Sequence, residues 1–307
     1  MMKAMVYRRY GGPEVLEPAE LPEPKTHFDS VLVRVRAAAL NPADLALQAG
    51  ARDGSVDTYF PVVPGWDIAG VVERSGPAAP EFAPGDEVIG YVRGDVQRAH
   101  GGLAELVSAD VRTLVRKPRA LGFAEAAGLP MAGLTAYQAV VHVLDVQPGE
   151  ILLVRGAAGG VGSLAVQIAR SRGARVIGAA SARDHGYLHT LGAEPVTYGK
   201  GAADRVRELA PDGADVVLDT VGGVLVATAS AVRPGARVAS IVEVGTPGVT
   251  SVFCRMSHTD LTALTELVET GKLTVRVGAT YPLERAADAQ RALAAGGTPG
   301  KVVVEIT

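Results

Sequence analysis

A glycine-rich segment between two apolar stretches is the strongest constraint on the fold of this chain. Within seven positions stand Gly156, Gly159, Gly160 and Gly162. Residues 151–154 before them are aliphatic, as in a buried strand, and residues 161–172 after them have the period of a helix. The apolar stripe of this helix consists of Val161, Leu164, Ala165 and Ile168. The sequence therefore predicts a strand, a tight turn and an amphipathic helix.

A turn of this kind is suited to bind a phosphate group. The first N–H groups of a helix point outward with the positive end of its dipole, and glycine lets a pyrophosphate approach the backbone closely. Aligned with the dinucleotide fingerprint G-x-G-x-x-G, the residues are Ala157, Gly159 and Gly162, so alanine replaces the first glycine. Packing alone also produces glycine-rich turns, but the location in a β-α-β unit favours dinucleotide binding.

The sequence pattern changes after Pro118. Before it, short strands separated by glycine and proline predict a β-rich domain, in which residues 30–39 alternate as in a half-buried strand. After it, strands alternate with helices, which is typical of a parallel sheet covered on both faces. We expect these strands at residues 151–154, 175–179, 196–198, 216–219 and 237–242. The predicted fold class is α/β.

The last part of the chain returns to the β-rich pattern. Residues 283–294 predict a helix, and residues 301–306 predict a closing strand. We therefore expect three segments, namely a catalytic domain at 1–118, a dinucleotide-binding domain at 119–256 and a return to the first domain at 257–307.

Composition narrows the class of function. The 307 residues carry a formal net charge of −3, which argues against nucleic acid as a partner and favours a small-molecule substrate. No apolar run approaches the roughly 18 residues of a membrane span, and the opening residues lack a signal-peptide segment, so we expect a cytoplasmic protein without membrane contact. Cys254 is the single cysteine, which excludes an intrachain disulfide and a cysteine-rich zinc site.

The end of the second strand of the dinucleotide-binding domain predicts which nucleotide binds. NAD sites usually carry a carboxylate there for the ribose hydroxyl, whereas this strand ends in Ala180 and Ser181. Ser181 and Arg183 can hold a 2′-phosphate through a hydroxyl and a guanidinium. A capping box from Ser181 to Asp184 is a second interpretation, compatible with the first. We expect NADPH rather than NADH.

Several motifs, in order, resemble one family nearly from end to end. They are NPAD (41–44), FPVVPGWDIAGVVERSG (60–76), FAPGDEVIGY (82–91), AAGLPMAGLTAYQAV (126–140), GAAGGVG (156–162), LDTVGG (218–223) and GKVVVEI (300–306). The chain is similar to the zinc-independent, zeta-crystallin-like quinone oxidoreductases of the medium-chain dehydrogenase/reductase superfamily. This resemblance implies a GroES-like catalytic domain followed by a Rossmann domain.

The resemblance also predicts that no metal takes part. Where zinc-dependent relatives place cysteine, histidine and glutamate, this chain has Asn41, Trp66 and Asp67. Zinc needs three or four N, S or O ligands in a tetrahedral arrangement, which these positions do not supply. Without a metal to polarise a simple ketone, hydride transfer to a quinone or to the β-carbon of an enone is favoured, because a conjugated product spreads the charge.

We therefore expect an NADPH-dependent reductase of a quinone or of the activated C=C bond of an enone. The cofactor supplies the hydride, and the protein positions and desolvates the reactants. Two alternatives stay open. One is an enoyl reductase that acts on carrier-bound thioesters in a biosynthetic pathway, and the other is a protein that binds NADPH without catalysis.

By resemblance, the cofactor residues lie along the predicted Rossmann domain. The pyrophosphate contacts the backbone of Ala158, Gly159, Gly160, Val161 and Gly162, and Thr135 lies near the nicotinamide. Tyr198 lies near the adenosine phosphate or, equally well, plugs the sheet edge. Val221 and Val244 follow strands at their carboxyl ends, where open α/β sheets bind ligands. Glu243 stands in an otherwise apolar strand end, and its role is open: it holds the carboxamide or faces solvent.

The catalytic candidates are fewer. Asn41 can donate its amide to a carbonyl or to the ribose, although asparagine before proline is commonly a turn former. Tyr59 offers a hydroxyl as a proton donor, with water as the alternative. We interpret Asp44 and Asp67 as buried structural carboxylates bonded to backbone N–H groups.

The resemblance further implies a homodimer. It forms when the last strands of two Rossmann sheets pair around residues 250–254, where the sequence VTSVFC would be a bare apolar edge. In this interpretation Cys254 is a strand residue rather than a nucleophile.

Overall fold

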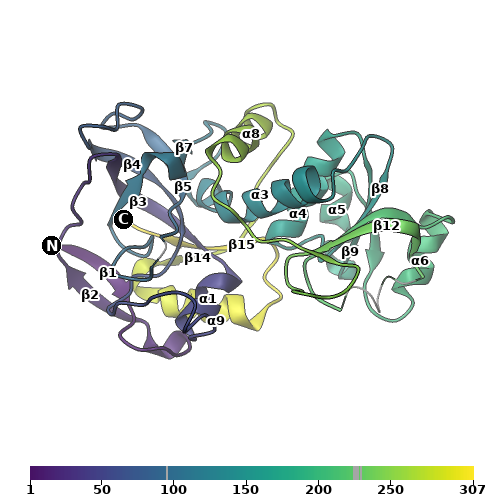
Figure 1. Cartoon of the computed structure of the whole chain (residues 1–307), viewed down its shortest axis with the longest axis horizontal. Helices are drawn as coiled ribbons and strands as arrows, with labels where there is room; N and C mark the ends of the chain where they lie inside the picture. Colours follow the sequence, from purple (N-terminus) through teal and green to yellow (C-terminus); the bar gives the residue numbers. More distant parts are fainter. Residues whose placement is uncertain (95, 224–227, 229) are drawn as a thin grey trace. The chain divides into compact units, whose positions relative to one another are not determined.

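The computed structural model describes residues 1–94, 96–223, 228 and 230–307, and the chain forms two compact units (Figure 1). The first unit consists of residues 1–131, 256–269 and 275–307. The second consists of residues 132–255 and 270–274. The end of the chain therefore belongs to the same unit as its beginning.

The first unit is built on a seven-stranded sheet in the order β14-β15-β3-β4-β5-β7, with β6 paired to β3. Its strands are β3 (Ser30–Leu40), β4 (Asp67–Ser75), β5 (Glu87–Tyr91), β6 (Leu106–Asp110), β7 (Leu114–Arg116), β14 (Val277–Pro282) and β15 (Lys301–Glu305). A separate antiparallel pair is formed by β1 (Met2–Val6) and β2 (Glu17–Leu21). The last strand, β15, lies inside the sheet, parallel to β14 and antiparallel to β3.

Burial along β3 departs from strict alternation. Val31, Leu32 and Val33 all belong to the apolar core of this unit, whereas Arg34 and Arg36 are exposed. At its start β3 pairs with both β4 and β6, so the sheet encloses these residues. The predicted half-buried alternation therefore holds only from Val33 to Arg36.

The second unit contains a parallel six-stranded sheet in the order β10-β9-β8-β11-β12-β13. Its strands are β8 (Ile151–Arg155), β9 (Arg175–Ala180), β10 (Glu194–Thr197), β11 (Ala214–Asp219), β12 (Val232–Ser240) and β13 (Thr250–Ser251). The connections include α4 (Gly160–Ser171), α5 (His185–Thr190) and α6 (Ala202–Leu209). The first strand lies at the centre and the order reverses beside it, as in doubly wound nucleotide-binding folds. The predicted α/β fold class is confirmed.

Two strand predictions are wrong in detail. The strand expected at 237–242 begins at Val232 and ends at Ser240, because the Ser240 Oγ accepts the next N–H groups and turns the chain. Cys254 is not a strand residue, since β13 ends at Ser251. The backbone of Arg255, the next residue, exchanges two hydrogen bonds with the Gln138 amide. These bonds take the chain away from the sheet ladder.

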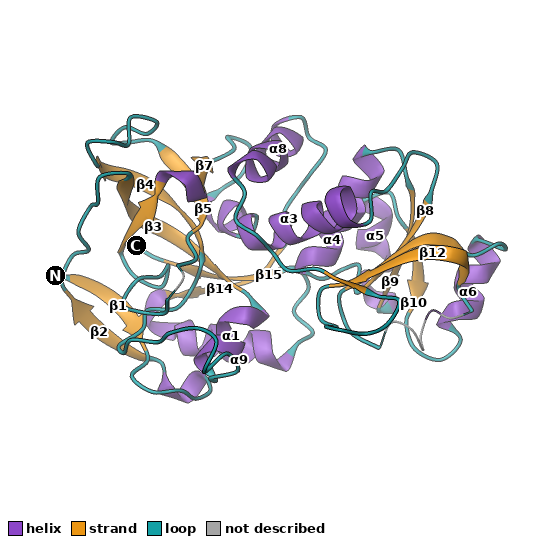
Figure 2. Cartoon of the chain, viewed as in Figure 1, coloured by secondary structure: helices purple, strands orange, loops and turns teal. Residues whose placement is uncertain are grey.

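Figure 2 shows the other helices of the described residues in purple. They are α1 (Pro42–Gln48), α2 (Phe123–Ala127), α3 (Pro130–Tyr137), α8 (His258–Glu269) and α9 (Ala286–Ala295). A six-residue π-helical segment, Gln138–Val143, continues α3. The helix predicted at 283–294 is a 3₁₀ turn, Leu283–Arg285, followed by α9. In the described ranges, no helix combines the length and apolarity needed to cross a membrane.

Candidate functional site

The turn between β8 and α4 has the geometry that a glycine-rich sequence permits. Gly156 has a φ of +73°, and a Cβ there would lie 2.3 Å from Thr220 Oγ1. A Cβ on Gly162 would lie 2.2 Å from the Gly156 carbonyl oxygen, so both glycines are required by packing. Ala157 is fully buried at the first fingerprint position. The tight-turn glycine is therefore Gly156, one residue earlier than the alignment of the fingerprint suggests.

Gly159 differs from its neighbours. Its backbone is extended, and a Cβ there would meet only the Gly156 oxygen, at 3.3 Å. This contact is tight, but it is far milder than the 2.2 Å clash that a Cβ on Gly162 would make. The first hydrogen bond of the α4 ladder runs from Ser163 N–H to the Gly159 carbonyl, at 3.0 Å. The N–H groups of residues 160–162 precede that bond, and such groups have no acceptor within their own helix. The turn fits a pyrophosphate.

The residues expected around the adenosine phosphate lie just beyond β9 and β10. The Ser181 hydroxyl donates to Asp184 Oδ2 at 2.7 Å, and Arg183 Nε lies 3.5 Å from the same oxygen. The predicted capping box is therefore altered, because the Ser181 side chain makes no bond to a backbone N–H. Arg183 is 65% exposed. Tyr198 is 63% exposed, so the alternative of an aromatic plug at the sheet edge is wrong.

Two further candidates follow the next strands of the sheet. Val221 lies in the loop after β11 and Val244 in the loop after β12, and both side chains are exposed. Glu243 is in this second loop and not in a strand, and its N–H donates to Ser240 Oγ at 3.0 Å. The turn at 158–162 and these residues all come directly after strands of one parallel sheet. The fold thus gathers them at the carboxyl edge of that sheet, the edge where open α/β sheets bind ligands. Thr135 lies elsewhere, buried in α3.

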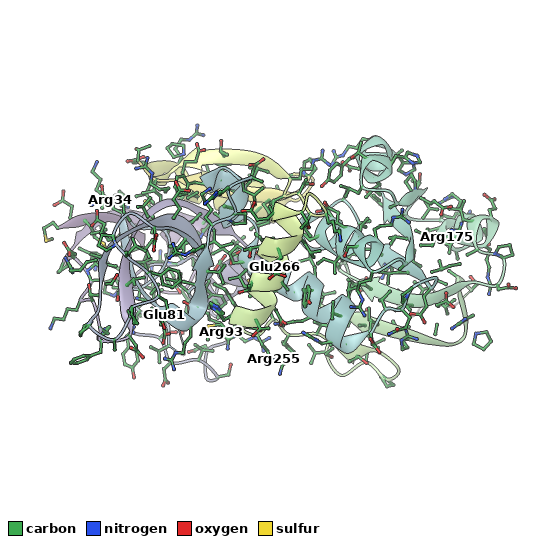
Figure 3. All side chains as sticks on the ribbon, turned by 90° about the horizontal axis from the view of Figure 1, so that it is seen from above. Arg34, Glu81, Arg93, Arg175, Arg255 and Glu266 are labelled. Atoms are coloured by element: carbon green, nitrogen blue, oxygen red, sulfur yellow. The ribbon has the colours of Figure 1, made fainter. Side chains whose placement is uncertain are left out.

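The opposite edge of this sheet carries structural ion pairs. Arg175, which Figure 3 labels, donates from Nε and Nη2 to the two carboxylate oxygens of Glu194 at 2.6 and 2.7 Å. These residues begin β9 and β10. At the start of β11, Asp215 pairs with Arg233 and accepts the Ile151 N–H at 2.6 Å. The amino edge is therefore occupied by pairs that join the strands.

In the first unit, Asn41 belongs to a buried polar cluster with Asp44, Asp67 and Lys301. The Asn41 amide donates to Asp67 Oδ2 at 2.9 Å, and its oxygen accepts from Lys301 Nζ. Lys301 Nζ also lies 3.8 Å from Asp67 Oδ2. Asp44 accepts the Asn41 N–H at 2.8 Å, and Asp67 accepts the Met131 N–H at 2.8 Å. The interpretation of both aspartates as structural carboxylates bonded to backbone N–H groups is confirmed.

Burial controls the protonation of this cluster. It raises the pKa of Asp44 to about 7 and the pKa of Asp67 to about 6, while the Lys301 ammonium opposes both shifts. Burial also lowers the pKa of Lys301, against the attraction of the two carboxylates. Sequence reasoning missed Lys301. Its signal was a lysine at the head of the apolar run KVVVEI, because such a residue needs an acceptor once the strand is buried.

Tyr59 lies in a different environment from Asn41. Its side chain is 62% exposed, and its N–H donates to the Gln97 carbonyl at 2.8 Å. In the part of the chain that the structure describes, no hydrogen bond joins Tyr59 to Asn41, Asp44, Asp67 or Lys301. Among the residues that the structure describes, no three or more histidine, cysteine, aspartate or glutamate side chains are grouped so as to hold a metal ion.

Comparison with known proteins places the chain in a family. The model described as "Alcohol dehydrogenase GroES-like domain" matches residues 27–119, and that described as "Zinc-binding dehydrogenase" matches residues 191–304. The chain is 34% identical to an NADPH-dependent alkenal/one oxidoreductase of Arabidopsis thaliana, over 99% of this chain and 79% of that protein. It is 29% identical to a quinone oxidoreductase of Homo sapiens, over 99% and 98% of the two chains.

A solved structure extends the likeness to three dimensions. The crystal structure of an NAD-dependent alcohol dehydrogenase superposes with a TM-score of 0.91 and 36% identity, over 100% of both chains. The order of the parallel sheet, the GroES-like first unit and these relatives agree with the resemblance seen in the sequence motifs. The chain belongs to the medium-chain dehydrogenase/reductase superfamily, in its quinone-oxidoreductase-like branch.

Proposed function

We propose that this protein is an NADPH-dependent oxidoreductase that reduces a quinone or the activated C=C bond of an enone without a metal ion. The observation that carries the proposal is the β8–α4 turn, in which the extended backbone of Gly159 comes directly before the N–H groups that open α4. The relatives support the reaction class, since one is named for NADPH-dependent reduction of alkenals and alkenones and another for quinones.

In this proposal, each group of residues has a physical task. NADPH supplies the hydride when bound. The backbone of residues 158–162 holds the pyrophosphate, and Ser181, Arg183 and Tyr198 surround the adenosine phosphate. Val221 and Val244 line the nicotinamide half, and Thr135, which is buried in α3, is a candidate by resemblance alone. Asn41 and Tyr59 belong to the first unit. By resemblance, Asn41 is the candidate hydrogen-bond donor to the carbonyl or the ribose, and Tyr59 is the candidate proton donor, with water as the alternative.

The buried cluster of the first unit supports the absence of zinc chemistry. Asn41 and Asp67 stand where the resemblance places zinc ligands in other branches, and both contact the Lys301 amine. Lys301 occupies this space as a hydrogen-bond donor, and its ammonium form repels a divalent cation. The donor set of one amide, one carboxylate and one amine is also poor for zinc, which prefers thiolate and imidazole.

Turnover tests the proposal directly. Purified protein, stripped with a chelator, is mixed with NADPH and a panel of quinones, enones and carrier-bound enoyl thioesters while the nicotinamide absorbance is followed. We expect oxidation of NADPH with free quinones or enones. Faster turnover of the thioesters would identify an enoyl reductase instead, and binding of NADPH without any turnover would identify a non-catalytic protein. Loss of activity on chelation, restored by zinc, would contradict the metal-free reaction.

We extend the proposal to a homodimer formed through the end of the second unit's sheet. The terminal strand β13 is two residues long and pairs with β12 through Ala239–Thr250 and Ser240–Ser251. Phe253, two residues beyond it, is 57% exposed. Pairing with the same strand of a second copy would satisfy the edge and cover this ring. A second copy of this chain is therefore the expected partner.

A further inference from the structure

Three polar residues end neighbouring strands at the carboxyl edge of the parallel sheet. Arg155 ends β8, Asp219 ends β11 and Ser240 ends β12, and the strand register places Asp219 beside both of the others. The strand order reverses between β8 and β11, which is where doubly wound sheets bind their ligands. Asp219 is fully buried at this point. A carboxylate is costly to bury unless it is paired and hydrogen-bonded, so its contacts show what it does.

The Asp219 carboxylate holds the loop that follows its own strand. Oδ1 accepts from Arg155 Nη1 at 2.6 Å, and Oδ2 accepts the Gly222 N–H at 3.0 Å. Arg155 Nη1 also donates to the Gly222 carbonyl at 2.8 Å. The N–H and the carbonyl of Gly222 are therefore both hydrogen-bonded to the Arg155–Asp219 ion pair. Val221, between Asp219 and Gly222, is held with its side chain exposed at the sheet edge.

Ser240 extends the same carboxylate to the next loop. Its Oγ accepts the Val242 N–H at 3.2 Å and the Glu243 N–H at 3.0 Å. Because the oxygen is the acceptor in both bonds, its own proton is available to Asp219 Oδ2, 2.9 Å away. The Ser240 hydroxyl therefore links the Asp219 carboxylate to the first N–H groups of the loop that carries Val244.

We propose that Asp219, with Arg155 and Ser240, is a positioning residue that fixes the two loops 219–223 and 240–244 for the nicotinamide half of the cofactor. This inference rests on the proposed function. Because one buried carboxylate holds both loops, the distance between the loops does not depend on the contacts that NADPH itself makes. Preorganised loops bind a ligand more tightly because the cost of ordering them is met on folding.

An ion pair at the other end of the same strand provides a matched control. Asp215 begins β11, is 8% exposed, pairs with Arg233 and accepts a backbone N–H, as Asp219 does. It lies at the amino edge of the sheet, away from the proposed cofactor loops. Asp215→Asn therefore removes the same charge from the same strand without touching residues 219–223 or 240–244.

The test compares NADPH with adenosine 2′,5′-bisphosphate, which carries the adenosine half and lacks the nicotinamide. Dissociation constants for both ligands are measured by calorimetry on the full chain, together with unfolding midpoints. In Asp219→Asn one acceptor oxygen becomes an NH₂ group, so we expect the Kd for NADPH to rise about tenfold or more, the scale of a displaced binding group. The Kd for the bisphosphate stays within about twofold, and Asp215→Asn changes the ratio of the two constants by no more than that.

Ser240→Ala keeps the proposal testable if Asp219→Asn fails to fold, since it removes a single oxygen. We expect it to weaken NADPH in the same selective way, by about threefold, the scale of one neutral hydrogen bond. Equal weakening of both ligands in these variants, or unchanged NADPH binding, would overturn the inference and leave the proposed function standing. A wild-type protein that binds neither ligand would overturn the proposed function, and the inference with it.

Discussion

Gly159 and Gly162 have different reasons to be glycine, although one motif contains both. At Gly162 an added Cβ would collide with backbone, the Gly156 oxygen at 2.2 Å and Ala157 Cα at 2.9 Å. At Gly159 the nearest atom, the Gly156 oxygen, is 3.3 Å away. The fold excludes a side chain at Gly162. At Gly159 a Cβ requires a shift of only a few tenths of an ångström, and the proposed pyrophosphate is a second reason for glycine there.

Alanine substitutions separate these reasons. Gly162→Ala should destabilise the protein by about 1–3 kcal/mol, the cost of overpacking against backbone. Gly159→Ala should lower the unfolding midpoint less than Gly162→Ala does and raise the Kd for NADPH at least about tenfold, because the new methyl group occupies the pyrophosphate's path. Gly186→Ala, where a Cβ meets nothing within 4 Å, is the control for the Gly-to-Ala change itself. Tight NADPH binding by the Gly159 variant would refute the pyrophosphate assignment.

Asp184 contacts both residues that we propose for the 2′-phosphate, so it should influence cofactor choice. Its carboxylate accepts a hydrogen bond from the Ser181 hydroxyl and lies 3.5 Å from Arg183 Nε. Ser181 and Arg183 are the two residues that we propose to bind the 2′-phosphate. The Asp184 carboxylate also repels a phosphate directly. Asp184→Asn should therefore lower the KM for NADPH about fivefold, the scale of roughly 1 kcal/mol, and change the KM for NADH little.

Steady-state kinetics with both nucleotides measures this shift. Asp212→Asn, in an exposed turn, removes one negative charge elsewhere and serves as the control. A variant that binds NADPH more weakly than the wild type would show that Asp184 holds Ser181 in place for the phosphate rather than competing with it.

At the scale of elements, β13 is the feature on which assembly depends. Phe253→Asp places a charge on the proposed dimer surface beside this strand and should convert the dimer to a monomer at micromolar concentration. Light scattering measures the mass. Phe28→Asp changes a more exposed ring, 76% accessible in the first unit, and should leave the dimer intact. A wild-type monomer would disprove the assembly outright.

The elements also show which strand ends the sequence pattern does not predict. The central strands β8, β9 and β11 and the helix α4 follow from local periodicity, because each is buried over most of its length. The end of β12 does not follow from periodicity, because the Ser240 hydroxyl sets it. After β13 the chain leaves the sheet because Arg255 is bonded to Gln138, which lies more than a hundred residues away in sequence. Side chains that cap backbone groups in this way leave no periodic signal.

For the whole molecule, the buried cluster of Asn41, Asp44, Asp67 and Lys301 predicts how stability depends on pH. Burial raises the pKa of Asp44 to about 7, above the ordinary aspartate value of about 3.9. Between these values the folded state binds a proton that the unfolded state lacks. The free energy of unfolding therefore falls as pH rises through this window, by at most about 1.4 kcal/mol per pH unit for one proton.

Asp44→Asn removes this proton but keeps an acceptor for the Asn41 N–H. Its stability relative to the wild type should therefore increase as pH rises from about 4 to about 7. Denaturant unfolding of both proteins at several pH values gives the difference, in which groups common to both cancel. Asp212→Asn should give a flat difference. A slope of the opposite sign for Asp44→Asn would show that the carboxylate is ionised throughout, held by Lys301.

Only part of the candidate site was predictable from the sequence. The predictable residues lie close to one another along the chain, and the others do not. The phosphate turn and the residues after each parallel strand are local, so the sequence places them at one edge once the strand order is known. The cluster around Asn41 is not local: Lys301 lies 260 positions away and reaches it because β15 enters the sheet beside β3. Asp219 was visible in the LDTVGG motif, but its partners Arg155 and Ser240 became apparent only from the register.

The place of β15 has a consequence for synthesis on the ribosome. This strand lies between β14 and β3, so the first unit lacks an interior strand until residues 301–305 have left the exit tunnel. Until then the edge of β3 that faces β15 is open and able to aggregate, and the second unit can fold before the first is closed. Deleting residues 301–305 would therefore open the middle of a sheet rather than fray its edge.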